Sequence, residues 1–239
     1  MSTPGAADFR ARHRGGGLFT ETVNQRLASY ACVLAYRTGA APTALTLLNL
    51  LLGLIASVAV TLLAPRLAAG TVPAVAVGLG ALVLWQLAYT LDCADGQLAR
   101  VTGRTSPAGA RVDVLCDVAL QISLVIAVSS VADAYHRIPV WLVGAFAGTW
   151  LVNLVTSVMQ QGAAAQSLVV SRSPGVRVLK LARDYGAVVT VLALAIAFVP
   201  RLLVWVIAAF TLVNGLFLAV SIVAAARASG RPATVPAQR

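Results

Sequence analysis

The chain has 239 residues, of which 59% are hydrophobic and only 11% are charged, and its mean hydropathy is +0.85. This composition excludes an ordinary water-soluble domain, whose surface carries far more charge. The net charge of +10 comes with only 6% aromatic residues, and the basic residues are not interleaved with aromatic ones, so nucleic-acid binding is excluded as well.

Residues 1–17 are polar, glycine-rich and basic, and we predict that they are disordered. They contain no apolar segment near the start, so no ordinary cleavable signal peptide is expected. Residues 18–38 place five large apolar side chains at helical spacing, with polar residues opposite them: Phe19, Val23, Leu27, Tyr30 and Leu34. This spacing predicts an amphipathic juxtamembrane helix, which either lies on the inner leaflet of the membrane or packs on the protein itself.

Residues 39–227 contain several apolar runs of the about 20 residues needed to cross a hydrocarbon core. We therefore predict an all-α polytopic membrane protein with six transmembrane helices, over roughly residues 43–64, 71–91, 111–132, 139–160, 178–199 and 202–226. Polar residues inside these spans, such as Asn49, Gln86 and Asn214, are expected to make interhelical hydrogen bonds. Gly144 and Gly148 have the spacing of a close helix contact, either within the chain or across a dimer. The tail, residues 228–239, is predicted to be disordered.

The basic residues predict the orientation of this membrane domain. Of the 18 Lys and Arg residues, only Arg66, Arg137 and Arg201 fall on one side of the six-span arrangement. The positive-inside rule then places both termini in the cytoplasm, together with residues 92–111 and 161–183. We expect a multi-pass protein of the cell's inner membrane with its active site facing the cytoplasm.

Four of the chain's eight acidic residues lie where spans two and three meet the cytoplasm: Asp92, Asp95, Asp113 and Asp117. Residues three or four apart share a helix face, and the segment between the two spans has turn residues at Gly103 and at Ser106-Pro107. Two antiparallel helices can therefore direct these carboxylates toward each other. Because four close carboxylates repel and hard oxygen ligands suit Mg²⁺ or Mn²⁺, we predict a site for one or two divalent cations per chain.

Small residues accompany the aspartates on the same helix faces, where they leave room for a ligand close to the backbone. The full pattern reads Asp92-x-x-Asp95-Gly96-x-x-Ala99-Arg100, then eight residues, then Gly109-x-x-x-Asp113-x-x-x-Asp117. This pattern resembles the motif of the CDP-alcohol phosphatidyltransferases, and eight positions at set spacing make the resemblance specific. The segment PTALT is similar to the family's Pro-Asn-x-x-Thr element, with Pro42 and Thr46 in place but Thr43 instead of Asn.

The resemblance implies a reaction in which an alcohol hydroxyl attacks the β-phosphate of a CDP-linked donor and CMP leaves. It implies that Asp92, Asp95 and Asp113 bind the divalent metals, and that Asp117 completes the metal site and acts as the general base. It also implies a homodimer in the lipid bilayer. The residues that it assigns to CDP binding are Thr46, Gly96, Ala99, Arg100 and Gly109.

The predicted second cytoplasmic loop holds a cluster of basic residues: Arg172, Arg177, Lys180 and Arg183. This cluster either binds a phosphorylated acceptor, because phosphate recognition favours clustered Arg and Lys, or anchors the chain to anionic lipid headgroups. Asp184 is spaced to face the same cleft as Arg177 and Lys180, and Gln121, one turn beyond Asp117, is a further candidate for acceptor binding. Val118 stands where relatives that use glycerol phosphate or inositol phosphate often have Arg or Lys, so the subgroup is not resolved.

We therefore expect a metal-dependent phosphatidyltransferase of phospholipid biosynthesis. It would move a phosphatidyl group from CDP-diacylglycerol to a small polar alcohol, with glycerol 3-phosphate or an inositol phosphate favoured. One alternative uses a soluble CDP-alcohol as the donor and diacylglycerol as the acceptor. An alternative of a different class is a divalent-cation transporter, whose acidic residues would more often lie near the bilayer midplane on broken helices.

Overall fold

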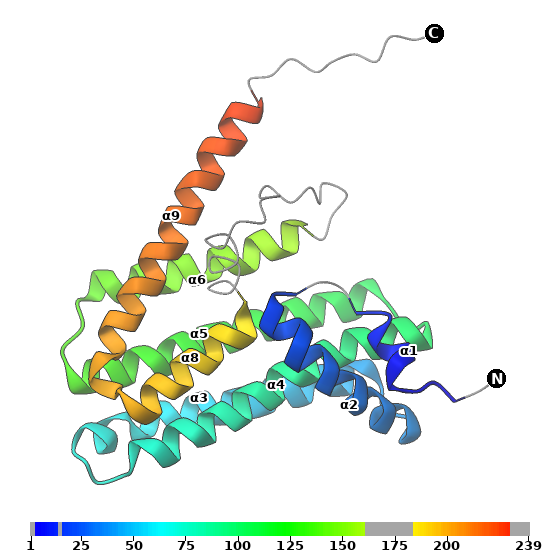
Figure 1. The fold of residues 1–239 in the computed structure, drawn as a ribbon, viewed down its shortest axis with the longest axis horizontal. Helices are drawn as coiled ribbons and strands as arrows, with labels where there is room; N and C mark the ends of the chain where they lie inside the picture. The colour runs from blue at the N-terminus through cyan, green and yellow to red at the C-terminus, as the bar shows by residue number, and fades with distance from the viewer. Residues whose placement is uncertain (1–2, 14–15, 161–183, 230–239) are drawn as a thin grey trace.

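The computed structural model describes residues 3–13, 16–160 and 184–229, and within these ranges every regular element is a helix. Figure 1 shows α3, α4, α5 and α8 gathered in a bundle, while α9 leans away from it. In chain order the elements are α1 (Ala6–Arg10), the π-helical η1 (Thr20–Asn24), α2 (Gln25–Arg37), α3 (Pro42–Ala68), α4 (Ala74–Thr102), α5 (Pro107–Tyr135), α6 (Val140–Gln160), α8 (Tyr185–Phe198), the 3₁₀ turn η2 (Pro200–Leu202) and α9 (Leu203–Ser229). The all-α class predicted from the sequence is thus confirmed for the described residues.

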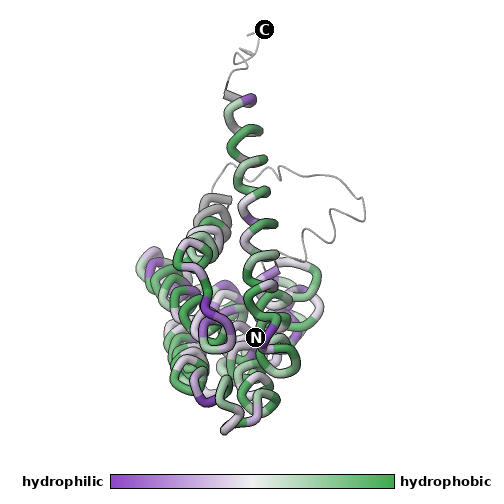
Figure 2. The backbone as a smooth tube through the Cα atoms, turned by 90° about the vertical axis from the view of Figure 1, so that its left-hand side faces the viewer, coloured by the Kyte–Doolittle hydropathy of each residue, from purple (hydrophilic) through white to green (hydrophobic). Residues whose placement is uncertain are grey.

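Four helical segments among the described residues are long and apolar enough to cross a membrane: α3, α4, α5 and Pro200–Val220. The apolar stretches of α6 and α8 are shorter, at Val140–Val152 and Tyr185–Phe198. These helices fit a multi-pass membrane protein, whereas the count of six spans stays a prediction. Figure 2 shows hydrophobic residues along most of the length of the helices, α9 included.

The fifth predicted span differs from the structure in where it begins. The sequence predicted a start near residue 178, but α8 begins at Tyr185, because the backbone of Asp184 is extended with φ −75° and ψ 110°. Residues 178–183 lie outside the described part of the chain, as do residues 230–239 of the predicted tail.

Proline and glycine set the helix ends near the aspartates. Pro107 occupies the first turn of α5, where a missing backbone N–H costs nothing, and the Ser106 hydroxyl accepts a hydrogen bond from the Gly109 N–H at 3.0 Å. Helix α4 ends at Thr102, and the next residue, Gly103, has a φ of +68°, the left-handed conformation that glycine adopts without strain. The predicted turn between the two aspartate-bearing helices is therefore confirmed.

Glycine also allows α4 and α8 to approach closely. A Cβ added at Gly78 would stand 2.4 Å from the backbone nitrogen of Ala197, so only glycine fits that crossing. By contrast, a Cβ at Gly144 or Gly148 would meet nothing within 4 Å. The predicted close contact at these two glycines is thus not made within the described chain, and a contact across a dimer stays a prediction.

The N-terminal segment is more ordered than the sequence predicted. Within residues 1–17, α1 forms a short helix, and its Phe9 has an exposed fraction of 0%. Phe9 belongs to an apolar cluster that includes Ala28 and Cys32 of α2 and Leu98 of α4. A single large aromatic side chain thus docks a segment whose composition is otherwise typical of a disordered tail.

Of the two arrangements that the sequence left open for α2, packing on the protein is confirmed, and contact with the inner leaflet stays a prediction. Its small residues Ala28, Cys32 and Ala35 are buried against the protein, and α2 packs on α4. Its large apolar residues Leu27, Tyr30 and Leu34 are 52%, 68% and 66% exposed and face away from the protein. A helix that packs with one face and presents a large apolar face outward has the amphipathic form expected at a lipid surface.

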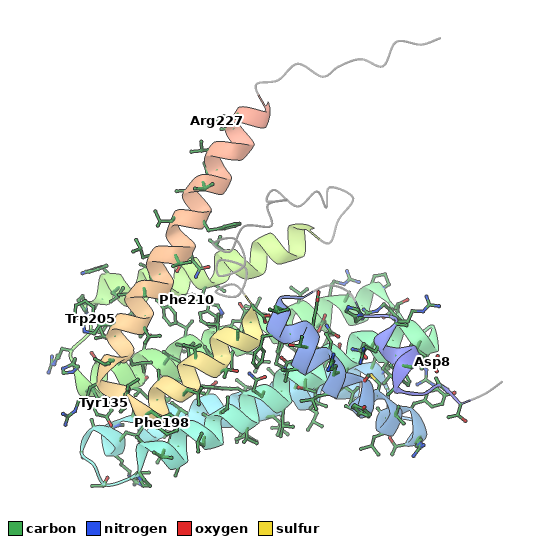
Figure 3. All side chains as sticks on the ribbon, in the orientation of Figure 1. Asp8, Tyr135, Phe198, Trp205, Phe210 and Arg227 are labelled. Carbon is green, nitrogen blue, oxygen red and sulfur yellow. The ribbon has the colours of Figure 1, made fainter. Side chains whose placement is uncertain are left out.

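The two ends of the bundle differ in what they carry. Figure 3 shows Tyr135, Phe198 and Trp205 at one end and Asp8 at the other. At the first end the Tyr135 hydroxyl donates a hydrogen bond to the Leu67 carbonyl at 2.9 Å, which joins the ends of α5 and α3. Three cations were predicted to lie outside the cytoplasm. They lie close to the ends of α3, α5 and α8, respectively: Arg66, Arg137 and Arg201.

Candidate active site

The aspartates of α4 and α5 converge as their spacing predicted. One carboxylate oxygen from each of Asp92, Asp95 and Asp113 lies within 4.8 Å of the others. Asp95 is buried and the other two are half-buried, so the cluster lies at the edge of the packed bundle. Three carboxylates at this distance form a set of hard oxygen ligands of the kind that binds Mg²⁺ or Mn²⁺.

The fourth aspartate lies beside this triad. Asp117 and Asp92 both line a narrow cavity of about 20 Å³ between α3, α4, α5 and α8. A space of this size holds about one water molecule. Gln121, one turn further along α5, is half-buried but is not among the residues that line this cavity.

An orphaned oxygen supports a cation at the triad. The Oδ1 atom of Asp113 is buried and has no hydrogen-bond partner among the described residues. Burying a carboxylate oxygen without a partner is costly unless a cation or a ligand compensates its charge. The residues present therefore fit a divalent cation held by Asp92, Asp95 and Asp113.

Helix α3 supplies hydrogen bonds to the carboxylates. The Thr46 hydroxyl donates to Oδ2 of Asp95, and Nδ2 of Asn49 donates to Oδ1 of Asp92 at 3.4 Å. The sequence assigned Thr46 to CDP binding, but in the structure its hydroxyl is directed at Asp95. Asn49 was expected only to make an interhelical hydrogen bond. Its place three residues after Thr46, on the same helix face, is the signal that links it to the site.

The Arg100 side chain is held over Gly96 by the N-terminal segment. Its Nε donates to the carbonyl of Arg12 at 2.6 Å. A Cβ at Gly96 would come within 2.9 Å of an Arg100 guanidinium nitrogen, so glycine makes room for that group. Gly109 and Ala99, the other small residues of the predicted CDP-binding set, are half-buried. Nothing in the sequence pattern indicated that residues 3–13 would reach the motif.

Asp184 has a different place from the one predicted. Rather than facing an acceptor cleft, it is 3% exposed and accepts hydrogen bonds from the backbone N–H of Thr20, at 3.0 Å, and from the Thr20 hydroxyl. The Thr20 hydroxyl also lies 3.1 Å from the Tyr89 hydroxyl of α4. Asp184 therefore ties η1 to the start of α8. The other residues of the predicted acceptor cluster, Arg172, Arg177, Lys180 and Arg183, lie outside the described part of the chain.

Further polar contacts tie the N-terminal helices to α4 and α8. Nδ2 of Asn24 donates to Oε1 of Gln86 at 2.8 Å, and Nε2 of Gln86 donates to the carbonyl of Gly186 at 2.8 Å. The Cys32 thiol donates to the carbonyl of Ala94 at 3.1 Å. Burial raises the pKa of the Cys32 thiol to about 12, so it stays protonated and keeps this hydrogen bond. These contacts hold η1 and α2 against α4 and α8.

Comparison with known proteins agrees with this geometry. A family model described as CDP-alcohol phosphatidyltransferase matches residues 40–223, well over half of the chain, and this range includes all four aspartates. No curated protein matches the chain. Carboxylates that converge at the ends of two apolar helices, in the family's motif and within a match of this length, lead to one conclusion. The chain belongs to the CDP-alcohol phosphatidyltransferase family, which are phosphotransferases that act on CDP-alcohol substrates in a lipid environment.

Proposed function

We propose that the protein transfers a phosphatidyl group from CDP-diacylglycerol to a small polar alcohol, with glycerol 3-phosphate or an inositol phosphate favoured, in phospholipid biosynthesis. The observation that carries the proposal is the convergence of Asp92, Asp95 and Asp113 within 4.8 Å, with Asp117 beside them. The outward apolar face of α2 supports a lipid substrate, because it would hold this end of the bundle at the membrane surface.

In the proposed reaction the acceptor's hydroxyl oxygen attacks the β-phosphorus of the donor. The bond between that phosphorus and the oxygen bridging to the α-phosphate breaks, and CMP leaves with that oxygen. Asp117 takes the proton of the hydroxyl group, since a carboxylate within hydrogen-bond reach serves as a general base. Its place beside Asp92 in the cavity wall would put that base next to the metal-binding triad.

Residues of α3 and α4 position the metal ligands and bind the donor. Thr46 and Asn49 hold the carboxylates of Asp95 and Asp92 in place, while Arg100, fixed by the Arg12 carbonyl, offers its guanidinium to the diphosphate. When bound by the triad, Mg²⁺ or Mn²⁺ would neutralise the phosphates and stabilise the charge on the departing CMP.

The test is CMP release by the purified protein in detergent or lipid nanodiscs. CDP-diacylglycerol and Mg²⁺ or Mn²⁺ are supplied with one acceptor at a time: glycerol 3-phosphate, inositol 1-phosphate, inositol or serine. We expect one acceptor to support CMP release together with a phospholipid of the matching mass, and Asp113→Asn to abolish both. No CMP with any acceptor would overturn the proposal.

A second donor arrangement is separated in the same assay. If a soluble CDP-alcohol is the donor and diacylglycerol the acceptor, CMP appears from CDP-choline or CDP-ethanolamine plus diacylglycerol, and not from CDP-diacylglycerol. Labelling the diacylglycerol part of CDP-diacylglycerol shows which arrangement holds, because the label enters the product only when CDP-diacylglycerol is the donor. Metal flux into liposomes without nucleotide would instead favour a transporter.

A further inference from the structure

A buried side-chain amide of α3 has an oxygen atom that accepts no hydrogen bond from the described residues. Asn49 is 2% exposed, and its Oδ1 atom has no hydrogen-bond partner among the described residues. The other half of the amide is occupied, because Nδ2 donates to the Asp92 carboxylate at 3.4 Å. The reverse orientation would bring an amide oxygen against a carboxylate oxygen, so this contact fixes which way the amide points. A buried acceptor without a partner costs free energy, and in native proteins it commonly marks a place for a ligand or a water molecule.

The same asparagine lines the cavity that holds the predicted general base. Asn49 of α3 faces it together with Asp92 of α4 and Asp117 of α5. A group bound to Oδ1 of Asn49 would therefore lie beside the Asp117 carboxylate. This arrangement separates Asn49 from Asn214 of α9, a further buried asparagine among the described residues, whose Nδ2 donates to a carbonyl of its own helix.

The cavity's lining selects the kind of group that fits. None of the described lining residues is Lys or Arg, while the lining includes Asp92, Asp117 and Asn49. The two carboxylates would repel a phosphate there, whereas an O–H or N–H group would find acceptors. The volume of about 20 Å³ admits one group of the size of water, not a whole polyol or ring. The cavity thus suits a single donor group at the end of a molecule whose remainder stays outside.

We propose that Asn49 determines acceptor specificity, with its Oδ1 accepting a hydrogen bond from the hydroxyl or amino group next to the acceptor's reacting hydroxyl. The inference rests on the proposed function, because it requires a small polar alcohol as the acceptor. With that neighbouring group on Asn49, the reacting hydroxyl lies toward Asp117, and a charged phosphate or carboxylate of the acceptor stays on the cytoplasmic side of the aspartates. Phosphatidyl transfer thereby favours an alcohol with a second donor group on the adjacent carbon.

The test compares each acceptor with an analogue that lacks the neighbouring donor group. The pairs are glycerol 3-phosphate and 3-hydroxypropyl phosphate, serine and 3-hydroxypropionate, and inositol or inositol 1-phosphate with their deoxy analogues. CMP release from CDP-diacylglycerol gives kcat/KM for each. For the pair that the wild-type protein uses, we expect kcat/KM to be about tenfold lower with the analogue, the factor that one hydrogen bond supplies.

Variants of Asn49 then test whether its side chain causes the tenfold difference in kcat/KM between the acceptor and its analogue. In Asn49→Ala and in the similarly sized Asn49→Leu, the acceptor and its analogue should be used equally well, with the ratio falling from about tenfold to about one. Asn214→Ala is the matched control, and it should keep the wild-type ratio. The KM for CDP-diacylglycerol and the Mg²⁺ concentration for half-maximal activity are measured alongside, because loss of the Asn49 hydrogen bond to Asp92 affects the acceptor and its analogue alike and leaves their ratio unchanged.

Several outcomes would overturn the inference, and they differ from failure of the proposed function. Equal use of acceptor and analogue by the wild-type protein overturns it without any variant, and means that a water molecule fills the cavity. An Asn49 variant that lowers both activities but keeps the ratio also overturns it, because the residue is then only structural. The inference is also overturned if the Mg²⁺ concentration for half-maximal activity rises by the same factor by which kcat/KM for the acceptor falls. In that case Asn49 acts only through Asp92. Only the absence of CMP with every acceptor removes the proposed function too.

Discussion

The carboxyl groups at the ends of α4 and α5 are chemically alike, but the structure gives them different surroundings. Three converge as a set of ligands, with a hydroxyl from Thr46 on Asp95 and an amide from Asn49 on Asp92. Asp117 lies to one side, in the cavity wall. This difference supports separate roles in cation binding and in proton transfer.

The role of Asp117 is tested by replacing its carboxylate with an amide. We expect Asp117→Asn to lower kcat for CMP release by about 10²–10⁴-fold, the usual contribution of a general base, because an amide cannot take the acceptor's proton. Asp133→Asn is the matched control, since Asp133 uses one side-chain oxygen to accept the Ile138 N–H at 3.0 Å, which an amide oxygen does equally well. Equal activity of the two variants would contradict the assignment.

A second residue-scale prediction concerns Cys32. Its thiol is fully buried between α2 and α4, and burial raises its pKa to about 12, so at pH 8 almost none of it is the reactive thiolate. We expect no modification of Cys32 by iodoacetamide in the folded protein at pH 8 and complete modification after denaturation, as read by mass spectrometry. Rapid modification in the folded state would show that α2 detaches from α4.

At the scale of elements, the contacts that hold the site run between segments far apart in the chain. Residue 12 reaches Arg100 of α4, and Thr20 of η1 reaches Asp184 at the start of α8. Gly17 allows that second contact, because a Cβ there would stand 2.2 Å from a carboxylate oxygen of Asp184. The N-terminal helices are thus held by polar bonds as well as by Phe9.

The crossing of α4 and α8 depends on the absence of one methyl group. We expect Gly78→Ala to destabilise the folded protein by about 1–3 kcal/mol, because the added Cβ would overlap the backbone of Ala197. Gly80→Ala, two residues further along α4, adds a Cβ that meets nothing within 4 Å, and should leave stability unchanged or raise it by up to about 1 kcal/mol. Thermal unfolding in detergent measures both, and equal effects would contradict the crossing.

In the whole molecule, the turns that join successive helices alternate between the two ends of the bundle. The turn after α3 and the turn after α5 meet at one end, as the bond from Tyr135 to Leu67 shows, and the turn from α4 to α5 lies at the other. With the excess of Lys and Arg on the aspartate side, we propose that this side faces the cytoplasm.

This orientation can be tested with single cysteines at exposed turns. The native Cys32, Cys93 and Cys116 are all buried, so they should give little background. We expect a membrane-impermeant maleimide to label Thr105→Cys only from the cytoplasmic face and Ala69→Cys only from the opposite face. The readout is a mass shift on gels, from inverted vesicles and from intact spheroplasts. Labelling of both positions from one face would rule out the alternating arrangement.

Local sequence rules were enough to predict part of the fold and part of the site. Helical spacing put Asp92 with Asp95 and Asp113 with Asp117 on single faces, and Gly103 with Ser106-Pro107 determined the turn between them. Apolar composition determined the all-α membrane class. These predictions needed only the spacing of residues a few positions apart, or the hydropathy averaged along the chain.

The packing of segments that are far apart in the chain set the remaining contacts of the site. It turned Thr46 toward Asp95, left Oδ1 of Asn49 without a partner among the described residues, and buried Asp184 against Thr20. It also docked Phe9, in a segment whose composition resembles that of a disordered tail. A side chain's hydrogen-bond partner in another helix depends on how the helices cross and rotate, and packing at positions such as Gly78 sets that geometry.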